Sequence, residues 1–268
     1  MDNAYAKINL AINVLGKRKD GYHELDMIMV PLELHDDIEV EKSDKTEIIG
    51  MDLPLEDNLM YKAIKLLEKE SKRYLPCKIT IQKNIPQEAG LAGGSSDCSY
   101  VLRKINEIYN LGYTLDELAV IASKLGSDTV FCMYNKPALI QGRGESIQFL
   151  NFSIPNYYIT LIKPNYGALT KDVFNNLKQY EKRDINLVIK ALQCDNLDKL
   201  SDVMFNDLEN STFDLYPHLR TLKEAFSYRG YHIMMSGSGT TLFIISKEKI
   251  TIKEDENYQV IYTKIKSD

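Results

Sequence analysis

A glycine-rich segment, residues 86–97, joins a predicted strand to a predicted helix and constrains the fold most strongly. It reads Pro-Gln-Glu-Ala-Gly-Leu-Ala-Gly-Gly-Ser-Ser-Asp. Glycines let backbone N–H groups converge on an anion because no Cβ stands in the way. The N-terminus of the following helix adds N–H groups and the positive end of its dipole. The segment therefore predicts a phosphate-binding loop.

The loop differs from the two commonest nucleotide-binding motifs. No Gly-Lys-Ser/Thr follows it, and the G-x-G-x-x-G spacing is absent. Ser95 and Ser96 offer hydroxyls to a phosphate oxygen or to a bound metal. The alternative interpretation is a plain glycine-rich turn in which Ser96 is an ordinary helix N-cap.

Hydrophobic periodicity outlines the first half of the chain. Residues 8–14 alternate as in a half-buried strand, which places Lys7 and Asn9 on the same face. We expect Asp57 to cap a helix, and Thr114 with Glu117 to form a capping box for a later helix that stops at Gly126. Further strands are predicted at 27–34, 38–40 and 78–83, and a helix follows the glycine-rich segment.

A polar stretch at residues 151–156 predicts a domain boundary. We expect one domain over residues 1–153 and a second over 154–268. Beyond the break, strands are predicted at 158–163, 231–235, 241–245 and 259–265, and helices at 170–178, 184–193 and 219–228. Strands and helices mix without regular βαβα alternation, so the fold class is α+β and not a doubly wound sheet.

Charge and composition exclude several classes of protein. A net charge of −5 disfavours a protein that binds nucleic-acid phosphates, which requires a dense cationic face. No apolar run approaches the ~20 residues of a membrane span, and no signal peptide is evident. Four scattered cysteines without a C-x-x-C pair suggest reduced thiols in a cytoplasmic protein, and the four histidines show no metal-ligand spacing.

Asp128 is a candidate for acid–base chemistry because it follows a predicted helix C-terminus. The negative end of a helix dipole disfavours a carboxylate there, and a nearby cation such as Lys7 would compensate. The alternatives are a solvated turn aspartate and a lysine that extends along the strand edge into water.

Two further motifs are ambiguous by themselves. Tyr22 and His23 offer a stacking face and a hydrogen-bonding edge for a planar base, or they are simply exposed. The second glycine cluster, residues 236–239, is typical of a tight hairpin turn. Together with the first loop, it would form another wall of one phosphate site.

Taken together, these motifs resemble the superfamily of galactokinase, homoserine kinase, mevalonate kinase and phosphomevalonate kinase, abbreviated GHMP. Within it, the chain is similar to the 4-diphosphocytidyl-2-C-methyl-D-erythritol kinases. The Arg-x-Asp-Gly-Tyr-His run at residues 18–23 separates that family from its relatives. The matching motifs follow in order over nearly the whole chain: residues 6–9, 16–23, 57–59, 89–97, 125–128, 142–145, 163–164, 206–209 and 235–239.

The resemblance implies a fold, a reaction and a set of site residues. The N-terminal half would resemble ribosomal protein S5 domain 2, and the C-terminal half would be ferredoxin-like. ATP would donate its terminal phosphate, with Mg²⁺, to the 2-hydroxyl of 4-diphosphocytidyl-2-C-methyl-D-erythritol, in the non-mevalonate route to isoprenoid precursors. Lys7 and Asp128 would be catalytic. ATP would be bound by Asn58, Pro86, Gln87, Glu88, Ala89, Gly90, Leu91, Ala92, Gly93, Gly94, Ser95 and Ser96, and the acceptor by Asn9, Tyr22, His23, Thr170 and Phe174.

Some positions depart from the family pattern, and other functions remain open at this stage. Ala92 replaces a glycine, so one N–H would approach the phosphates less closely. Thr129 and Val130 stand where Val-Pro is common. The alternatives are a related homoserine or mevalonate kinase, a non-catalytic nucleotide sensor, and an RNA-binding module. No obligate protein partner, nucleic acid or membrane is expected.

Overall fold

The computed structural model describes residues 3–267, which divide into two compact units. The first unit comprises residues 1–6, 34–85 and 92–135, and the second comprises residues 7–33, 86–91 and 136–268. Neither unit is one continuous stretch of sequence, because two long strands contribute residues to both. These strands are β1 (Ala4–Lys17) and β2 (His23–Lys42).

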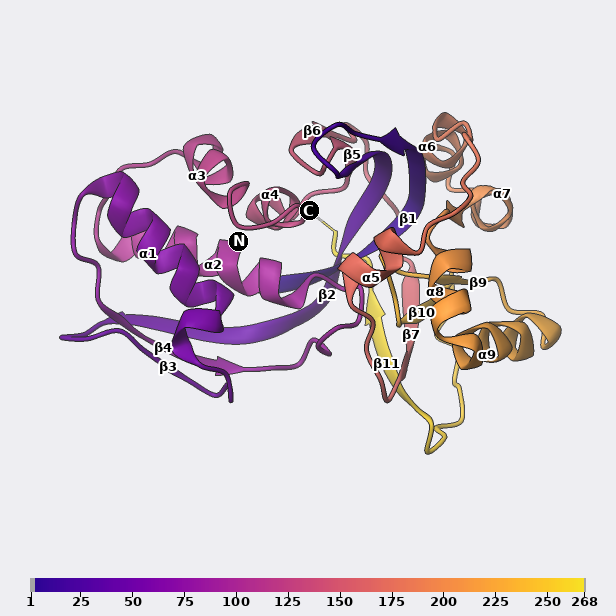
Figure 1. Cartoon of the computed structure of the whole chain (residues 1–268). Helices are drawn as coiled ribbons and strands as arrows, with labels where there is room; N and C mark the ends of the chain where they lie inside the picture. The colour runs from indigo at the N-terminus through magenta and orange to yellow at the C-terminus, as the bar shows by residue number, and fades with distance from the viewer. Residues whose placement is uncertain (1–2, 268) are drawn as a thin grey trace. The chain divides into compact units, whose positions relative to one another are not determined.

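The first unit packs helices on a small sheet (Figure 1). The C-terminal part of β2 runs antiparallel to β4, and β3 runs parallel to β4. The helices α1 and α2 pack against each other, as do α2 and α4. The elements are β3 (Glu47–Ile49), η1 (Leu55–Asp57), α1 (Leu59–Ser71), β4 (Cys77–Gln82), α2 (Gly93–Ile108), α3 (Leu115–Ala122) and α4 (Thr129–Tyr134).

The second unit contains a four-stranded antiparallel sheet in the order β11-β7-β10-β9. Its other strands extend from β1 and β2: β8 pairs parallel with β1, and β5 pairs antiparallel with β2 and with β6. The strands are β5 (Ala138–Gly142), β6 (Ser146–Phe149), β7 (Tyr158–Pro164), β8 (Phe205–Asn206), β9 (Ile233–Met235), β10 (Leu242–Ser246) and β11 (Tyr258–Lys264). The helices are α5 (Thr170–Asn175), α6 (Asn186–Gln193), α7 (Leu197–Val203), α8 (Glu209–Leu215) and α9 (Pro217–Tyr228).

The α+β class is confirmed, and several local predictions need correction. Strand β1 is buried on both faces from residue 6 to residue 14, and not on one face as the alternation suggested. The two strands predicted at 27–34 and 38–40 are parts of the single 20-residue strand β2. The capping box of Thr114 and Glu117 is present at α3, but that helix ends at Ala122, before Gly126.

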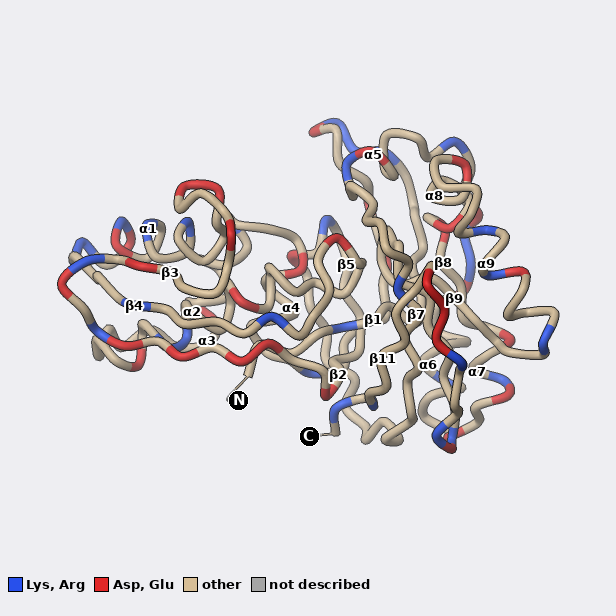
Figure 2. Tube along the Cα trace, turned by 90° about the horizontal axis from the view of Figure 1, so that it is seen from below, with Lys and Arg blue, Asp and Glu red and all other residues tan. Residues whose placement is uncertain are grey.

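Along the Cα trace, Lys and Arg are interspersed with Asp and Glu in both units (Figure 2). Within residues 3–267, no helix combines the length and apolarity needed to cross a bilayer. Cys77, Cys98 and Cys132 are buried and Cys194 is exposed, and none of the four forms a disulfide within the described residues.

Candidate active site

The first unit presents the start of α2 as an open helix N-terminus. Its N-cap residue is Ala92, and no side chain caps the first N–H groups. A Cβ placed on Gly94 would meet no atom within 4 Å. Uncapped donors beside open space, at the positive end of a helix dipole, suit an anion. The backbone therefore fits the predicted phosphate site.

The two serines of the loop differ in where their hydroxyls point. Ser96 is buried inside α2, and its hydroxyl donates to the Tyr5 carbonyl over 2.7 Å. The alternative in which Ser96 caps the helix is therefore wrong. Ser95 is half-buried, which leaves its hydroxyl as the better placed of the two for a ligand.

A buried ionic cluster lies directly behind the start of α2. The Lys83 ammonium bonds to the carboxylates of Asp36 and, over 2.7 Å, Asp97. It also lies 3.4 Å from where a Cβ on Gly93 would be. Burial raises the pKa of Asp97 to about 7, the neighbouring Asp36 adds to the increase, and Lys83 opposes it. The cluster fixes the start of α2 against β2 and the end of β4.

Asn58 and Asp128, two predicted site residues, also belong to the first unit. Asn58 is the N-cap of α1, where its Oδ1 accepts from the Met60 N–H over 2.8 Å, so Asp57 is not the cap. Asp128 occupies the N-cap position of α4, without a capping hydrogen bond from its side chain. The dipole at that end favours a carboxylate, which corrects the expectation that the dipole disfavours it.

The turn that carries Asp128 lies against the start of α2. A Cβ on Gly126 would lie 3.9 Å from the Ser95 hydroxyl oxygen and 3.6 Å from the Thr129 methyl group. The Ser99 hydroxyl donates to the Thr129 carbonyl over 2.9 Å. The first unit thus gathers the start of α2, Ser95 and the Asp128 turn.

In the second unit, Lys7 is held beside the first part of the phosphate loop. It is only 3% exposed, and its ammonium donates to Asn9 Oδ1 over 2.7 Å and to the Gly90 carbonyl over 3.0 Å. The Lys7 N–H donates to the Leu91 carbonyl over 3.1 Å. The predicted pairing of Lys7 with Asn9 on one face is therefore confirmed. A buried ammonium fixed by two oxygens is a positioned cation and not an extended surface lysine.

The second glycine cluster, Ser236–Gly239, contacts the same loop. The Ser236 hydroxyl donates to the Gly90 carbonyl over 3.0 Å. Gly90 has a φ of +73°, and a Cβ there would lie 2.1 Å from the Ser236 carbonyl oxygen. Only glycine fits both that conformation and that approach. The prediction that both glycine segments border one phosphate site requires such a contact.

The candidate base-binding residues are also in the second unit. The rings of His23 and Phe174 stack with centroids 5.2 Å apart and planes inclined by 26°. Burial, together with the charge of Lys17, lowers the pKa of His23. Tyr22 is 54% exposed, and the Arg143 guanidinium lies 5.0 Å from its ring centroid. Thr170 bonds through its hydroxyl to Ser238 over 2.9 Å.

The remaining loop residues contribute backbone more than side chains. Pro86 and Leu91 belong to the second unit and Ala92 to the first, so the loop passes from one to the other. Gln87 and Glu88 are exposed, and the carbonyl of buried Ala89 accepts from the Thr241 N–H over 3.3 Å. Among residues 3–267, no group of three or more His, Cys, Asp or Glu could hold a metal ion.

Sequence reasoning assigned no role to several residues that support these sites. Asp36, Lys83 and Asp97 form their cluster only through the pairing of β2 with β4. Arg143 reaches Tyr22 from the hairpin between β5 and β6, although its Gly-Arg-Gly-Glu motif was visible as a family match. Asn206 belongs to another such motif and bonds to the Ser236–Gly239 turn.

Comparisons with known proteins identify the family of the chain. The description "GHMP kinases N terminal domain" matches residues 58–136, and "GHMP kinases C terminal" matches residues 188–258. A 4-diphosphocytidyl-2-C-methyl-D-erythritol kinase of Bacillus cereus (strain B4264) is 40% identical over 248 residues, covering 90% of this chain and 86% of the relative. The corresponding kinase of Bacillus anthracis is 39% identical over the same coverage.

Solved structures show the same fold. A crystal structure of 4-(cytidine 5'-diphospho)-2C-methyl-D-erythritol kinase is 27% identical, with a TM-score of 0.76, covering 91% of this chain and 88% of that one. The L. major mevalonate kinase in complex with R-mevalonate also gives a TM-score of 0.76 at 16% identity, covering 99% of this chain and 95% of that one. At 16% identity, the similarity to the mevalonate kinase shows a common fold alone. Together the matches show a two-domain GHMP kinase fold.

Proposed function

The chain belongs to the 4-diphosphocytidyl-2-C-methyl-D-erythritol kinases of the GHMP superfamily, and on this premise we propose how its residues carry out the reaction. The terminal phosphate of ATP is transferred to the 2-hydroxyl of 4-diphosphocytidyl-2-C-methyl-D-erythritol, giving the 2-phosphate and ADP. The observation that carries the proposal is the buried Lys7 ammonium bonded to the Gly90 carbonyl of the phosphate loop. We place the reaction in the cytoplasm, as a step toward isoprenoid precursors.

The loop over residues 86–96 binds the phosphates of ATP. The uncapped N–H groups at Gly93, Gly94 and Ser95 bind phosphate oxygens of ATP, and Asn58 lies near the nucleotide. Such transfers pass through a loose transition state, so positioning and charge stabilisation supply most of the rate. The Lys83 cluster fixes the position of this helix end when the anion binds.

Lys7 and Asp128 act at the acceptor hydroxyl. The oxygen of the 2-hydroxyl forms its bond to the γ-phosphorus as the bond from phosphorus to the ADP oxygen breaks. Asp128 accepts the hydroxyl proton, and the Lys7 ammonium stabilises the charge on the acceptor oxygen. Asn9 keeps Lys7 in place and contacts the substrate. A positioned proton acceptor of this kind is worth on the order of 10²–10⁴ in rate.

The cytosine ring of the acceptor binds among Tyr22, His23 and Phe174, with Thr170 nearby. Tyr22 and Phe174 provide two aromatic faces, and base–aromatic stacking contributes about 1–3 kcal/mol per base. The lowered pKa of His23 keeps its ring neutral near pH 7, with one N–H donor and one acceptor nitrogen. The acceptor nitrogen can accept from the amino group of cytosine, whereas the carbonyl of uracil at the same position has no hydrogen to donate.

Mg²⁺ is expected with ATP, and the residues of the site fit a metal held mainly by the nucleotide. The described residues 3–267 contain no cluster of three acidic or histidine ligands, whereas Mg²⁺ commonly keeps several waters and binds substrate phosphates. Ser95 would supply a hydroxyl to the metal or to a phosphate oxygen. Mg²⁺ supplies charge neutralisation on the transferred phosphate.

An acceptor panel tests the proposal. ADP release is followed with 4-diphosphocytidyl-2-C-methyl-D-erythritol, homoserine and mevalonate as separate acceptors. We expect turnover with the cytidyl compound alone. Comparable turnover with homoserine or mevalonate would show a different GHMP kinase, and nucleotide binding without turnover of any acceptor would indicate a sensor.

A further inference from the structure

The Ser236–Gly239 turn determines where Lys7 and Gly90 lie. A Cβ on Gly237 would lie 2.9 Å from the Gly90 carbonyl oxygen and 3.2 Å from the Lys7 ammonium nitrogen. The Ser236 hydroxyl donates to that same Gly90 carbonyl over 3.0 Å. The turn has almost no free space on this side, so a displacement of the turn moves Gly90, Lys7 or both.

Asn206 holds this turn from the opposite side. Its amide nitrogen donates to the Met235 carbonyl and to the Gly237 carbonyl, each over 2.8 Å. Its amide oxygen accepts from the Leu208 N–H over 2.9 Å. Both amide hydrogens and the oxygen are therefore used, and the residue is only 6% exposed. No other side-chain type of this size offers two donors and an acceptor in this geometry.

Asn206 is itself fixed to the strand that carries Lys7. Strand β8 pairs with β1 so that Asn206 lies opposite Ile12. The next residue, Asp207, donates its N–H to the Ile12 carbonyl over 3.0 Å and accepts from the Val14 N–H over 2.8 Å. Asn206 thus connects two parts of the site, namely β1 and the glycine turn.

A further polar residue of the motif, Glu209, strengthens the same connection. Its carboxylate accepts from the Met235 N–H over 2.9 Å and pairs with the Lys223 ammonium over 2.5 Å. Asn206 and Glu209 therefore bind the backbone carbonyl and the backbone N–H of Met235, at the end of β9 just before the turn. The Thr212 hydroxyl adds a bond to the Ser238 carbonyl over 3.2 Å.

We propose that Asn206 is a positioning residue for phosphoryl transfer, which acts by fixing the Ser236–Gly239 turn against Gly90 and the Lys7 ammonium. The inference rests on the proposed function, since it assigns the fixed turn a part in that reaction. Asn206 touches neither Lys7 nor the loop in any bond described above. Asn206 instead acts through its hydrogen bond to the Gly237 carbonyl, which fixes the turn.

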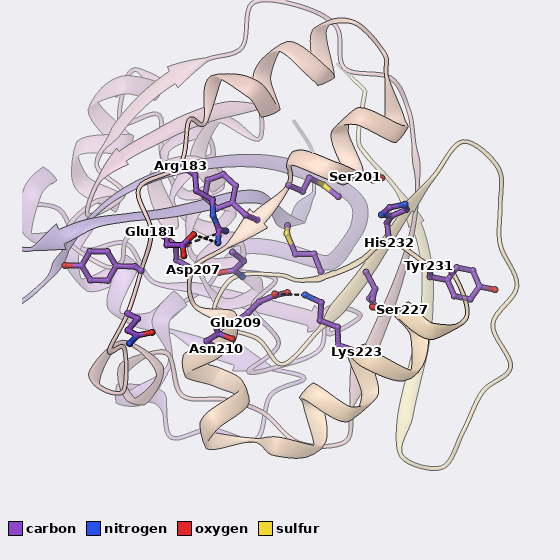
Figure 3. A pocket seen from close by; sticks show the side chains of 18 residues that line it. Glu181, Arg183, Ser201, Asp207, Glu209, Asn210, Lys223, Ser227, Tyr231 and His232 are labelled. Carbon is purple, nitrogen blue, oxygen red and sulfur yellow. Dashed lines mark hydrogen bonds and ion pairs between the residues drawn. The ribbon is translucent and has the colours of Figure 1, made fainter.

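A cavity of about 630 Å³ is lined in part by Asn206. Asp207, Glu209, Asn210 and Lys223 also line it, and Figure 3 shows the Lys223–Glu209 pair at its wall. A molecule as small as acetamide therefore has a route to the space that a truncated Asn206 would leave.

The test compares Asn206→Ala with Asn210→Ala, a matched control. Asn210 lines the same cavity but is exposed on α8. We expect Asn206→Ala to lower kcat by roughly 10- to 100-fold, since a misplacement near 1 Å costs about that much. The Michaelis constant for the cytidyl substrate should change less than 3-fold, about 0.7 kcal/mol. Acetamide should restore part of kcat, and acetate, which has no N–H, should not. Asn210→Ala should behave as wild type.

A double-mutant cycle with Ser236→Ala tests the route of the effect. If Asn206 acts through the turn, the two losses in kcat are less than additive, because Ser236→Ala already frees the turn from Gly90. If Asn206→Ala does not fold, Asn206→Asp replaces it in the kinetic comparison and in the double-mutant cycle, with the same expected loss of kcat, and the acetamide arm is omitted because aspartate leaves no space for it. Normal kcat in the folded variant, or strictly additive losses, would overturn the inference. Wild-type turnover in the same assay separates this failure from failure of the proposed function.

Discussion

Gly94→Ala separates a ligand-binding role of the loop from a structural one. A Cβ at Gly94 meets no atom within 4 Å, and its φ is outside the left-handed region. The methyl group therefore costs nothing in packing. Alanine is also the better helix former by up to about 1 kcal/mol, so the free energy of unfolding should stay constant or rise slightly.

The same methyl group would occupy the space where a phosphate must approach the first turn of α2. Loss of one charge-assisted hydrogen bond costs about 1.5–3 kcal/mol. We therefore expect the dissociation constant for ATP to rise roughly 10- to 150-fold. Gly16→Ala is a matched control, because its Cβ also meets nothing within 4 Å but lies in β1, outside the loop. It should leave ATP binding unchanged.

Calorimetric titration with a non-hydrolysable ATP analogue, together with urea unfolding, measures both quantities. If this helix end binds phosphate, the Gly94→Ala variant is as stable as the wild type but binds the nucleotide poorly. Wild-type affinity in that variant would refute phosphate binding at this helix end. A large loss of stability would instead show that the glycine has a structural role.

Three further predictions concern other parts of the site. Asp128→Asn should preserve folding and ATP binding but lower kcat by on the order of 10²-fold or more, and near-normal kcat would exclude a catalytic role. Tyr22→Ala should raise the Michaelis constant for the cytidyl substrate roughly 5- to 150-fold without changing that for ATP, and CDP should compete better than UDP; equal weakening of both substrates would contradict the cytosine pocket. Burial raises the pKa of Asp97 to about 7, whereas an unfolded carboxyl titrates near ~4, so its contribution to stability is present at low pH and is lost as pH rises through 7. Urea unfolding of Asp97→Asn should therefore show a stability relative to wild type that increases from about pH 4 to about pH 7 and then levels off, and a constant difference over that range would argue against the raised pKa.

Sequence patterns predicted the helices and strands whose formation depends on neighbouring residues in the chain. Strands β7, β10 and β11 alternate or carry continuous apolar runs, and each was predicted within two residues of its ends. The capping box at α3 is equally local, because Thr114 and Glu117 satisfy each other's backbone groups.

Elements that depend on tertiary contacts were not predicted. Separate strands were predicted at 27–34 and 38–40, but β2 is continuous because it pairs with β5 over residues 25–29 and with β4 over residues 37–42. The six-residue helix α4 has no side-chain cap and is too short to show a periodic pattern.

The site residues could likewise be predicted together only where they are close in sequence. Neighbouring residues such as Lys7 and Asn9 could be placed together, because strand geometry alone puts positions i and i+2 on one face. Asn206 and Gly237 are 31 positions apart, and no spacing rule connects them. Likewise, the cluster around Lys83 needs Asp36 from a different strand, 47 positions away.

The most direct test of the account is the identity of the product. The chain is incubated with ATP, Mg²⁺ and 4-diphosphocytidyl-2-C-methyl-D-erythritol, and the mixture is analysed by ³¹P NMR and mass spectrometry. The account predicts one equivalent of ADP for each new phosphomonoester, with the added phosphate on the 2-hydroxyl and the cytidyl diphosphate intact. Phosphate on another hydroxyl, or release of inorganic phosphate in place of a phosphomonoester, would contradict it.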